Sequence, residues 1–312
     1  MKIRFLLLLL TCWTVAFAHA APMKGAVRQF RFGVLQQSDT ASDATLKDAI
    51  ARANQKNLSF LVVNGIKSDD ESCSDSLYQR RKDLLNESEK AVVLSLAGSD
   101  WIECKSEEGN PLAVERLQRL RELYFGSGHA LGAKKIKLVR QSSMAKFRGF
   151  PENAYWQQGK ILFATIHLPA ANNHYLPAAG RNSEFEDRLI ANRHWLQRIF
   201  SLARLHKMRG IVLFADGNPI AVPSKNSRPR DGFLEMRKQI TLLAARLPGR
   251  VLLVHGHAPS PAGQIAWRDN LGTVGAGKDW LEISANPASS RVFFTSRASA
   301  GKVLHARPAN KK

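Results

Sequence analysis

The sequence has 312 residues, of which 44% are hydrophobic, so it is long enough for one large domain or two small domains with a buried core. It contains 46 Lys and Arg residues against 26 Asp and Glu residues, and the net charge of +20 favours acidic partners. The basic residues are scattered and do not form an array interleaved with aromatic residues, which argues against a nucleic-acid-binding protein.

The beginning of the chain has the three parts of a secretory signal peptide. Lys2 and Arg4 precede an apolar run over residues 5–17, and Ala18-His19-Ala20 supplies a small-residue cleavage site. A lipoprotein signal at Cys12 is an alternative. The apolar run is too short to favour a membrane anchor, and no later segment is apolar for long enough to span a bilayer. We therefore expect an exported protein from which residues 1–20 are removed.

The remaining chain shows no internal repeat and no low-complexity linker. We predict a single domain over residues 21–300, followed by a basic tail over residues 301–312. Removal of the signal peptide leaves two cysteines, Cys73 and Cys104. Because an exported protein meets an oxidising compartment, we expect a disulfide between them, and two free thiols are the alternative.

Short apolar runs recur along the chain, and each ends in a small or polar cluster. They are rich in Val, Ile, Leu and Phe and lack clean alternation, which is typical of strands covered on both faces. The predicted strands are 30–35, 58–63, 91–96, 161–166, 210–214 and 251–254.

Helical patterns lie between several of these strands. They cover residues 45–53, 74–86, 111–125, 185–206 and 234–247, with Ser74 or Asp75 as an N-cap and Pro111 in a first turn. Residues 280–284 and 291–295 follow as an antiparallel pair. Alternation of strands and helices with a final hairpin predicts a layered α/β sandwich, in which mostly two-face-buried sheets are flanked by helices.

Polar residues follow the predicted strands, where chemistry in such sheets is usually found. Several of these clusters are candidates for a metal or phosphate site assembled from separated segments. They are Gln36 to Asp39, Asn64 to Ser68, Ala97 to Trp101, His167 to Pro169, Asp216 to Pro219 and His255 to Pro259. The cluster Asp216-Gly217-Asn218-Pro219 is first of all a turn sequence, with Asn218 as a possible site-lining residue.

A series of short motifs occurs in a defined order along the chain. They are Gly65-Ile66-Lys67-Ser68, Cys73-Ser74-Asp75, Arg80-Arg81-Lys82, Ser99-Asp100-Trp101 with Cys104, Asn172-Asn173, Ala191-Asn192 with Trp195-Leu196, Asn218-Pro219, and Val251 to Gly256. This order resembles the calcineurin-like metallophosphoesterase superfamily, and within it an exported bacterial branch. The resemblance covers about residues 28 to 295 and implies a metallophosphoesterase-like fold, a two-metal site, and a bacterial periplasmic or extracellular location.

The chain departs from the superfamily at most of its metal-binding motifs. Where the superfamily has D-x-H, this chain has Gln37-Ser38-Asp39, and where it has G-D, this chain has Asn64-Gly65. G-N-H-D/E becomes Ala97-Gly98-Ser99-Asp100, so that only the acidic residue remains. G-H-x-H becomes Gly256-His257-Ala258-Pro259, so that the first His remains, and His167 is a substitute for the lone His of the superfamily.

These departures remove the groups that two-metal chemistry requires. Two dications roughly 3.5–4 Å apart need anionic bridging, which Gly65 and Gly98 lack the side chains to provide. Ser99 is a poor general acid, and Pro259 offers no ligand. A single metal such as Zn²⁺ or Mn²⁺, bound by Asp39 and His257 with His255 or His167, is an alternative. In another interpretation the histidines are hydrogen-bonded polar residues at a strand end.

The sequence therefore predicts an exported, metallophosphoesterase-like protein that is a non-catalytic pseudoenzyme with a binding or structural role. Its expected partner is a phosphorylated or anionic ligand or an envelope polymer. Two alternatives remain open: a metal-dependent phosphoester hydrolase with a remodelled one-metal site, and a basic envelope-associated protein that acts through its surface charge.

Overall fold

The computed structural model describes residues 29–37, 42–177, 180, 182–222, 230–256, 263–277 and 280–296. The predicted signal peptide and basic tail lie outside these residues. Within them, none of the helices combines the length and the apolar composition that a bilayer crossing needs.

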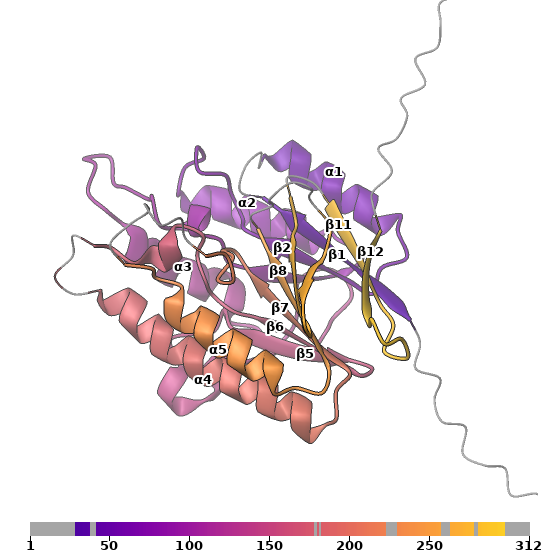
Figure 1. Ribbon diagram of the computed structural model, residues 1–312. Helices are drawn as coiled ribbons and strands as arrows, with labels where there is room; N and C mark the ends of the chain where they lie inside the picture. Colours follow the sequence, from indigo (N-terminus) through magenta and orange to yellow (C-terminus); the bar gives the residue numbers. More distant parts are fainter. Residues whose placement is uncertain are drawn as a thin grey trace, which may run out of the picture.

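The chain forms two β-sheets that pack face to face (Figure 1). The first has the order β12-β11-β1-β2-β3, with β1 Phe30–Gln36, β2 Phe60–Asn64, β3 Ala91–Ser95, β11 Trp280–Ala285 and β12 Phe293–Ser296. The second has the order β4-β5-β6-β7-β8-β10-β9. Its strands are β4 Val139–Arg140, β5 Ala154–Gln158, β6 Ile161–Thr165, β7 Gly210–Ala215, β8 Arg250–His255, β9 Ala266–Arg268 and β10 Leu271–Gly275.

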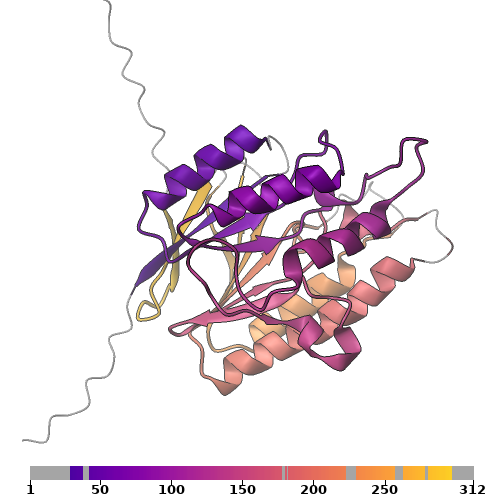
Figure 2. The ribbon, with the colours of Figure 1, turned by 180° about the vertical axis from the view of Figure 1, so that it is seen from behind.

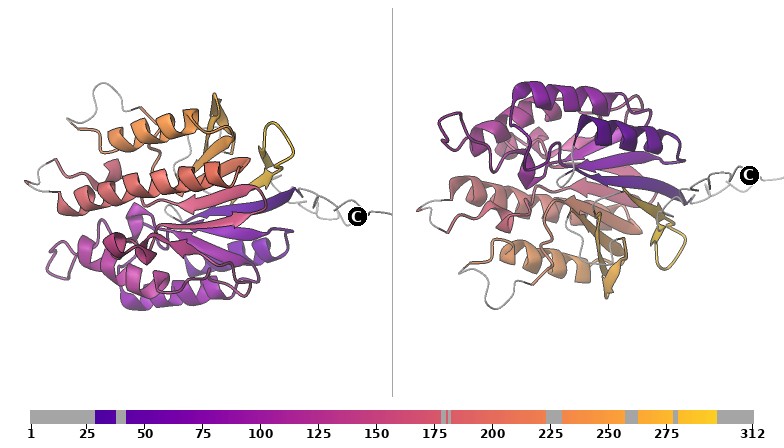
Figure 3. Two further views of the ribbon diagram at one scale, coloured as in Figure 1. Left: turned by 90° about the horizontal axis from the view of Figure 1, so that it is seen from below. Right: turned by 90° about the horizontal axis from the view of Figure 1, so that it is seen from above.

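In the described part of the chain, five α-helices cover the outer faces of the two sheets. The helices α1 Asp43–Asn54, α2 Asp75–Asn86 and α3 Ala113–Phe125 lie on the first sheet, as the view from behind shows (Figure 2). The helices α4 Ser183–Leu205 and α5 Leu234–Ala245 lie on the second. Four short 3₁₀ turns connect other elements: η1 Gly98–Asp100, η2 Gln141–Ser143, η3 Ala145–Phe147 and η4 Asn172–His174. The views along the layers show the order helices, sheet, sheet, helices (Figure 3).

Alternate side chains of the central strands point to opposite faces of each sheet, and both faces are buried. Phe32, Phe60, Phe163 and Phe214 meet Trp156 in the layer between the sheets, where Phe32 stacks on Phe60 with ring centroids 5.2 Å apart. The alternating residues on the other faces join the helices in two further apolar layers. The predicted layered α/β sandwich with two-face-buried sheets is therefore confirmed.

Most predicted elements are present, with small shifts at their ends. β11 and β12 form the predicted antiparallel pair, and Ser74 caps α2 by accepting a hydrogen bond from the Leu77 N–H. Pro111 is not in a first turn, because α3 begins at Ala113. Strands β4, β5, β9 and β10 were not predicted. The predicted disulfide is confirmed, with the Cα atoms of Cys73 and Cys104 5.8 Å apart.

Candidate functional site

The carboxyl ends of six strands meet at one end of the sandwich. β1, β2 and β3 run parallel to one another in the first sheet, and β6, β7 and β8 do so in the second. Hydrogen bonds between residues that follow these strands link the two sheets. The candidate site is therefore the polar cluster at this end, as the strand-end clusters of the sequence predict.

Asp216, which follows β7, is the centre of the cluster and is buried. Its Oδ1 accepts a hydrogen bond of 3.2 Å from Nδ2 of Asn64, at the end of β2. Its Oδ2 accepts hydrogen bonds of 2.8 Å from the backbone N–H groups of Gly98 and Ala170. Nδ2 of Asn64 also donates to Oε1 of Gln36 at 2.6 Å. One carboxylate thus joins segments that follow β2, β3 and β6.

Asp100, in η1, forms a second carboxylate centre and is fully buried. Its Oδ1 accepts from the backbone N–H groups of Ile66 at 2.6 Å and Lys67 at 3.3 Å, and its Oδ2 accepts from Ala97 at 2.9 Å. Burial raises the pKa of Asp100 to about 7, because the lost hydration outweighs these three N–H groups and the charge of Asp216 adds to the rise. Through the hydrogen bonds from Ile66 and Lys67, the Asp100 side chain holds the loop after β2 in place.

The two glycines in the departing motifs lie beside these carboxylates in closed surroundings. Gly65 has φ 84°, a left-handed conformation, and an added Cβ would lie 3.2 Å from the Cβ of Ala97. An added Cβ at Gly98 would lie 3.0 Å from Cδ1 of Ile102 and 3.5 Å from Oδ2 of Asp216. A side chain at either position would therefore press on neighbouring atoms, and at Gly65 it would also have to adopt a left-handed backbone conformation.

The structure describes some of the other residues of these motifs and not others. Gln37 is buried, and its Oε1 has no hydrogen-bond partner among the described residues. Oγ of Ser99 is also buried and has no hydrogen-bond partner among the described residues. Ser38, Asp39, His257 and Pro259 lie outside the described residues, so two of the four candidate metal ligands have no described position.

The other two candidate metal ligands, His255 and His167, are buried at strand ends. His255 is the last residue of β8 and pairs with Ala215 and Gly275 in the sheet. His167 follows β6, and its Nδ1 lies 3.0 Å from Oε1 of Glu152. With the proton on Nδ1, Nε2 of His167 is an acceptor, and it has no hydrogen-bond partner in the described part of the chain.

Glu152 is a buried carboxylate that the sequence analysis did not identify. It forms a two-point ion pair with Arg121, with distances of 2.6 Å and 3.1 Å. Burial alone would raise its pKa, but Arg121 and His167 together lower the pKa of Glu152 to about 2. Burial lowers the pKa of His167 despite this carboxylate. A neutral His167 that donates to an ionised Glu152 is the state that fits these contacts.

Helix α4 fixes the backbone after β6 through two polar residues, of which the sequence analysis noted Asn192 as part of a motif but missed Arg188. Arg188 and Asn192, one helical turn apart, both donate to the carbonyl oxygen of His167, at 3.4 Å and 2.8 Å. Arg188 also pairs with Glu184 at 2.6 Å. The sequence contained a signal for this role, because Arg188 and Asn192 are polar residues at i and i+4 on an otherwise apolar helix face.

Asn218 does not line the cluster through its side chain. Its Oδ1 accepts from the backbone N–H groups of Ile220 at 3.0 Å and Ala221 at 3.3 Å, which closes the turn after β7. In the described ranges, no three His, Cys, Asp or Glu side chains form a group that can hold a metal ion. Both carboxylates at the strand ends accept hydrogen bonds from backbone N–H groups.

No family model and no curated protein matches the sequence. Among solved structures, the chain is similar to that of PhoD, with a TM-score of 0.49 and 10% identity over 83% of this chain, and it spans 64% of the PhoD chain. It is also similar to TT1561 of Thermus thermophilus, with a TM-score of 0.46 and 9% identity over 86% of this chain and 98% of that one.

Proposed function

We propose that the chain is an exported, metallophosphoesterase-like binding protein that lacks phosphoesterase activity. The order of its motifs along the sequence and its layered α/β sandwich support the resemblance to that superfamily. The replaced residues at Gln37, Gly65, Gly98, Ser99 and Pro259 support the loss of the reaction.

The hydrogen bonding of Asp216 carries this proposal. A carboxylate that ligates a divalent ion directs its lone pairs at the ion. Those of Asp216 accept from Asn64, Gly98 and Ala170. The described donors therefore do not fit a two-metal centre, and we derive no step through metal ions. A network of neutral donors around the carboxylate substitutes for cations at the strand ends.

The test combines metal analysis with an activity assay on the purified mature protein. We expect no stoichiometric metal after incubation with Zn²⁺ or Mn²⁺ and dialysis. We also expect no hydrolysis of bis-p-nitrophenyl phosphate or p-nitrophenyl phosphate above the buffer rate with Mn²⁺. Stoichiometric metal together with turnover that disappears in His257→Ala would contradict the proposal and establish the one-metal hydrolase instead.

Export is tested separately by N-terminal sequencing of the protein recovered from the periplasm or culture medium. The motif Ala18-His19-Ala20 leads us to expect Ala21 as the first residue. Recovery of the full sequence from the cytosol would contradict export, without bearing on the absence of catalysis.

The excess of basic residues leads us to propose an anionic partner, either a phosphorylated small molecule or an envelope polymer. Titration with inorganic phosphate and with anionic lipid vesicles distinguishes the two sources. Binding to vesicles that collapses between low and moderate salt would favour action through the surface charge. Binding of inorganic phosphate that persists at moderate salt would favour the strand-end cluster as the binding site. Asn218→Ala serves as the control, because it changes the turn after β7 beside the cluster and should leave phosphate binding unchanged.

A further inference from the structure

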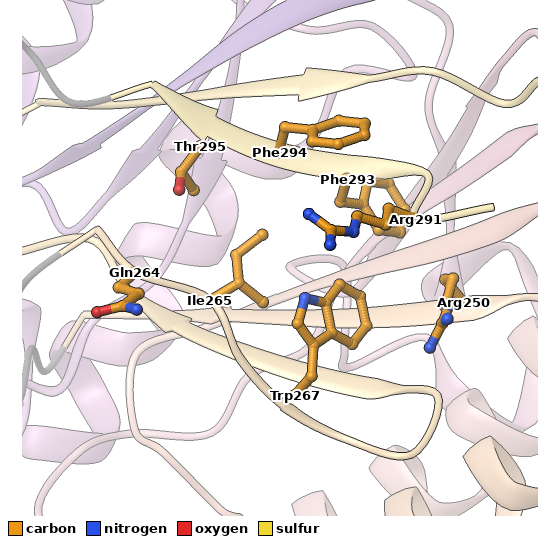
Figure 4. Close-up of a pocket in the computed structure, with 8 residues that line it drawn as sticks. All are labelled: Arg250, Gln264, Ile265, Trp267, Arg291, Phe293, Phe294 and Thr295. Carbon is orange, nitrogen blue, oxygen red and sulfur yellow. The ribbon is translucent and has the colours of Figure 1, made fainter. Parts of the chain in front are cut away.

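A cavity of about 530 Å³ lies at the side of the sandwich, away from the strand-end cluster (Figure 4). It is bordered by β9, an edge strand of the second sheet, and by β12, an edge strand of the first. Its lining residues are Arg250, Gln264, Ile265, Trp267, Arg291, Phe293, Phe294 and Thr295. Arg250 begins β8, whereas His255 ends it, so the cavity reaches the end of β8 opposite to the candidate site.

Two glycines make room for the aromatic rings of this cavity. An added Cβ at Gly272 would lie 2.8 Å from Cζ3 of Trp267, so the indole packs directly on the backbone of β10. An added Cβ at Gly210 would lie 2.7 Å from Cζ of Phe293. Trp267 nevertheless keeps 38% of its surface exposed. The packing on Gly272 thus fixes the indole, and part of its surface remains exposed.

The turn that presents Arg291 has a strained backbone. Val292 has φ 60°, which is unfavourable for a β-branched residue. The N–H of Phe293 donates to the carbonyl oxygen of Arg291 at 2.7 Å, which closes a three-residue turn. The buried side chain of Val292 anchors this turn in the layer between the sheets. Such strained turns persist where surrounding packing holds them, and they are concentrated at ligand sites.

Two arginine side chains add positive charge to the aromatic lining. The guanidinium of Arg250 lies 5.2 Å from the ring centre of Trp267 and donates to the carbonyl oxygens of Ser290 and Asp269. These two bonds leave three of the five guanidinium donor hydrogens. Arg291 extends from the β12 side toward Ile265 and Trp267 (Figure 4). Within the described ranges, neither arginine forms an ion pair with a carboxylate.

We propose that this cavity is a binding site for a small aromatic anion. An aromatic ring of the ligand packs against the exposed part of Trp267 and contacts Ile265. Its carboxylate or phosphate accepts hydrogen bonds from Arg291 and from the remaining donors of Arg250. A volume of about 530 Å³ lies within the range of ligand pockets and fits a molecule of one or two rings.

The test uses three probes and isothermal titration calorimetry on the mature protein. Naphthoate supplies the ring and the charge, naphthalenemethanol supplies the ring alone, and acetate supplies the charge alone. We expect the tightest saturable binding for naphthoate. Arg291→Gln should weaken naphthoate binding about tenfold, the effect of one lost charge-assisted hydrogen bond, and leave naphthalenemethanol unchanged. Trp267→Ala should weaken the binding of both aromatic probes.

Arg268→Gln is the matched control, because it removes the same charge from the exposed strand β9 at a residue that does not line the cavity. It should leave all three affinities unchanged, and circular dichroism should report the same fold for every variant. The proposal is refuted if naphthoate shows no saturable binding, if Arg291→Gln binds it as tightly as wild type, or if Arg268→Gln weakens it equally. Each of these outcomes is independent of whether the strand-end cluster binds metal or phosphate.

Discussion

Replacement of Asp216 by alanine should destabilise the fold, because its carboxylate is a structural acceptor. The change removes three hydrogen bonds, from Nδ2 of Asn64, the N–H of Gly98 and the N–H of Ala170. A hydrogen bond to an ionised acceptor contributes about 1.5 kcal/mol net, and a buried donor left without a partner costs about the same or more. We therefore expect Asp216→Ala to lower the free energy of unfolding by about 4 kcal/mol.

Urea denaturation followed by circular dichroism measures this loss, in buffer with and without EDTA. Asp216→Asn keeps the volume but turns one oxygen into a donor that faces N–H groups, so about half of the loss should remain. Asn218→Ala is the control, since it opens only the adjacent turn and should cost about 1 kcal/mol or less. A loss below about 1 kcal/mol for Asp216→Ala, or an equal loss when EDTA is added to wild type, would refute the structural role of this carboxylate.

Three further changes test other parts of the structure. Glu152→Gln should cost about 3 kcal/mol at neutral pH, because it leaves the half-buried Arg121 without its carboxylate. Because the pKa of Glu152 falls from 4.5 to about 2 on folding, the ionised carboxylate stabilises the fold above pH 4.5, and this stabilisation is lost as the pH falls toward 2. In acid denaturation, the free energy of unfolding of Glu152→Gln should therefore lack this part of the pH dependence. Cys104→Ser opens the bridge to Cys73, which spans 31 residues, and should cost about 3–4 kcal/mol, with equal stability of variant and wild type in reductant. Gly65→Asp restores a carboxylate to the motif but places a side chain on a residue with a φ of 84°. Urea denaturation should show a free energy of unfolding lower by about 1–2 kcal/mol, and the variant should gain no phosphodiesterase activity.

Much of the fold was predictable because its strands are apolar on both faces. Runs such as residues 60–64 and 91–95 have no polar residue until their ends, so their presence can be read from composition, although the predicted bounds of 58–63 and 91–96 differ from the observed ones by one or two residues. β9, by contrast, is an edge strand of three exposed residues, Ala266-Trp267-Arg268, without a pattern of burial. Pro111 was misassigned because it lies two positions before the first helical residue, Ala113, and Leu112 occupies the N-cap position.

The candidate site was predictable in position but not in its interactions. Strand-end clusters identified the region, since parallel strands bring their carboxyl ends together. Asp216 was assigned to a turn, because its sequence neighbours Gly217 and Asn218 favour one, and the turn is present. Its partners, Asn64 and Gly98, are 152 and 118 residues away in the chain, and no local pattern predicts such pairs.

The hydrogen bonds to the two carboxylates at the strand ends offset the cost of burying them. Asp100 and Asp216 are both buried, and a buried charge is costly unless other groups stabilise it. Asp100 receives three backbone N–H groups and a pKa near 7, so part of its charge is removed by protonation at neutral pH. Asp216 receives two backbone N–H groups and the amide of Asn64, an uncharged residue that can donate where a carboxylate could not. Replacing Asn64 with Asp would put a third acid against Asp216, and without a cation it would destabilise the cluster. In our proposal, Gln36, Asn64 and Gly65 are therefore neutral residues that depend on one another. Changing any one of them alone back to the residue of the superfamily motif is not expected to recreate a metal site.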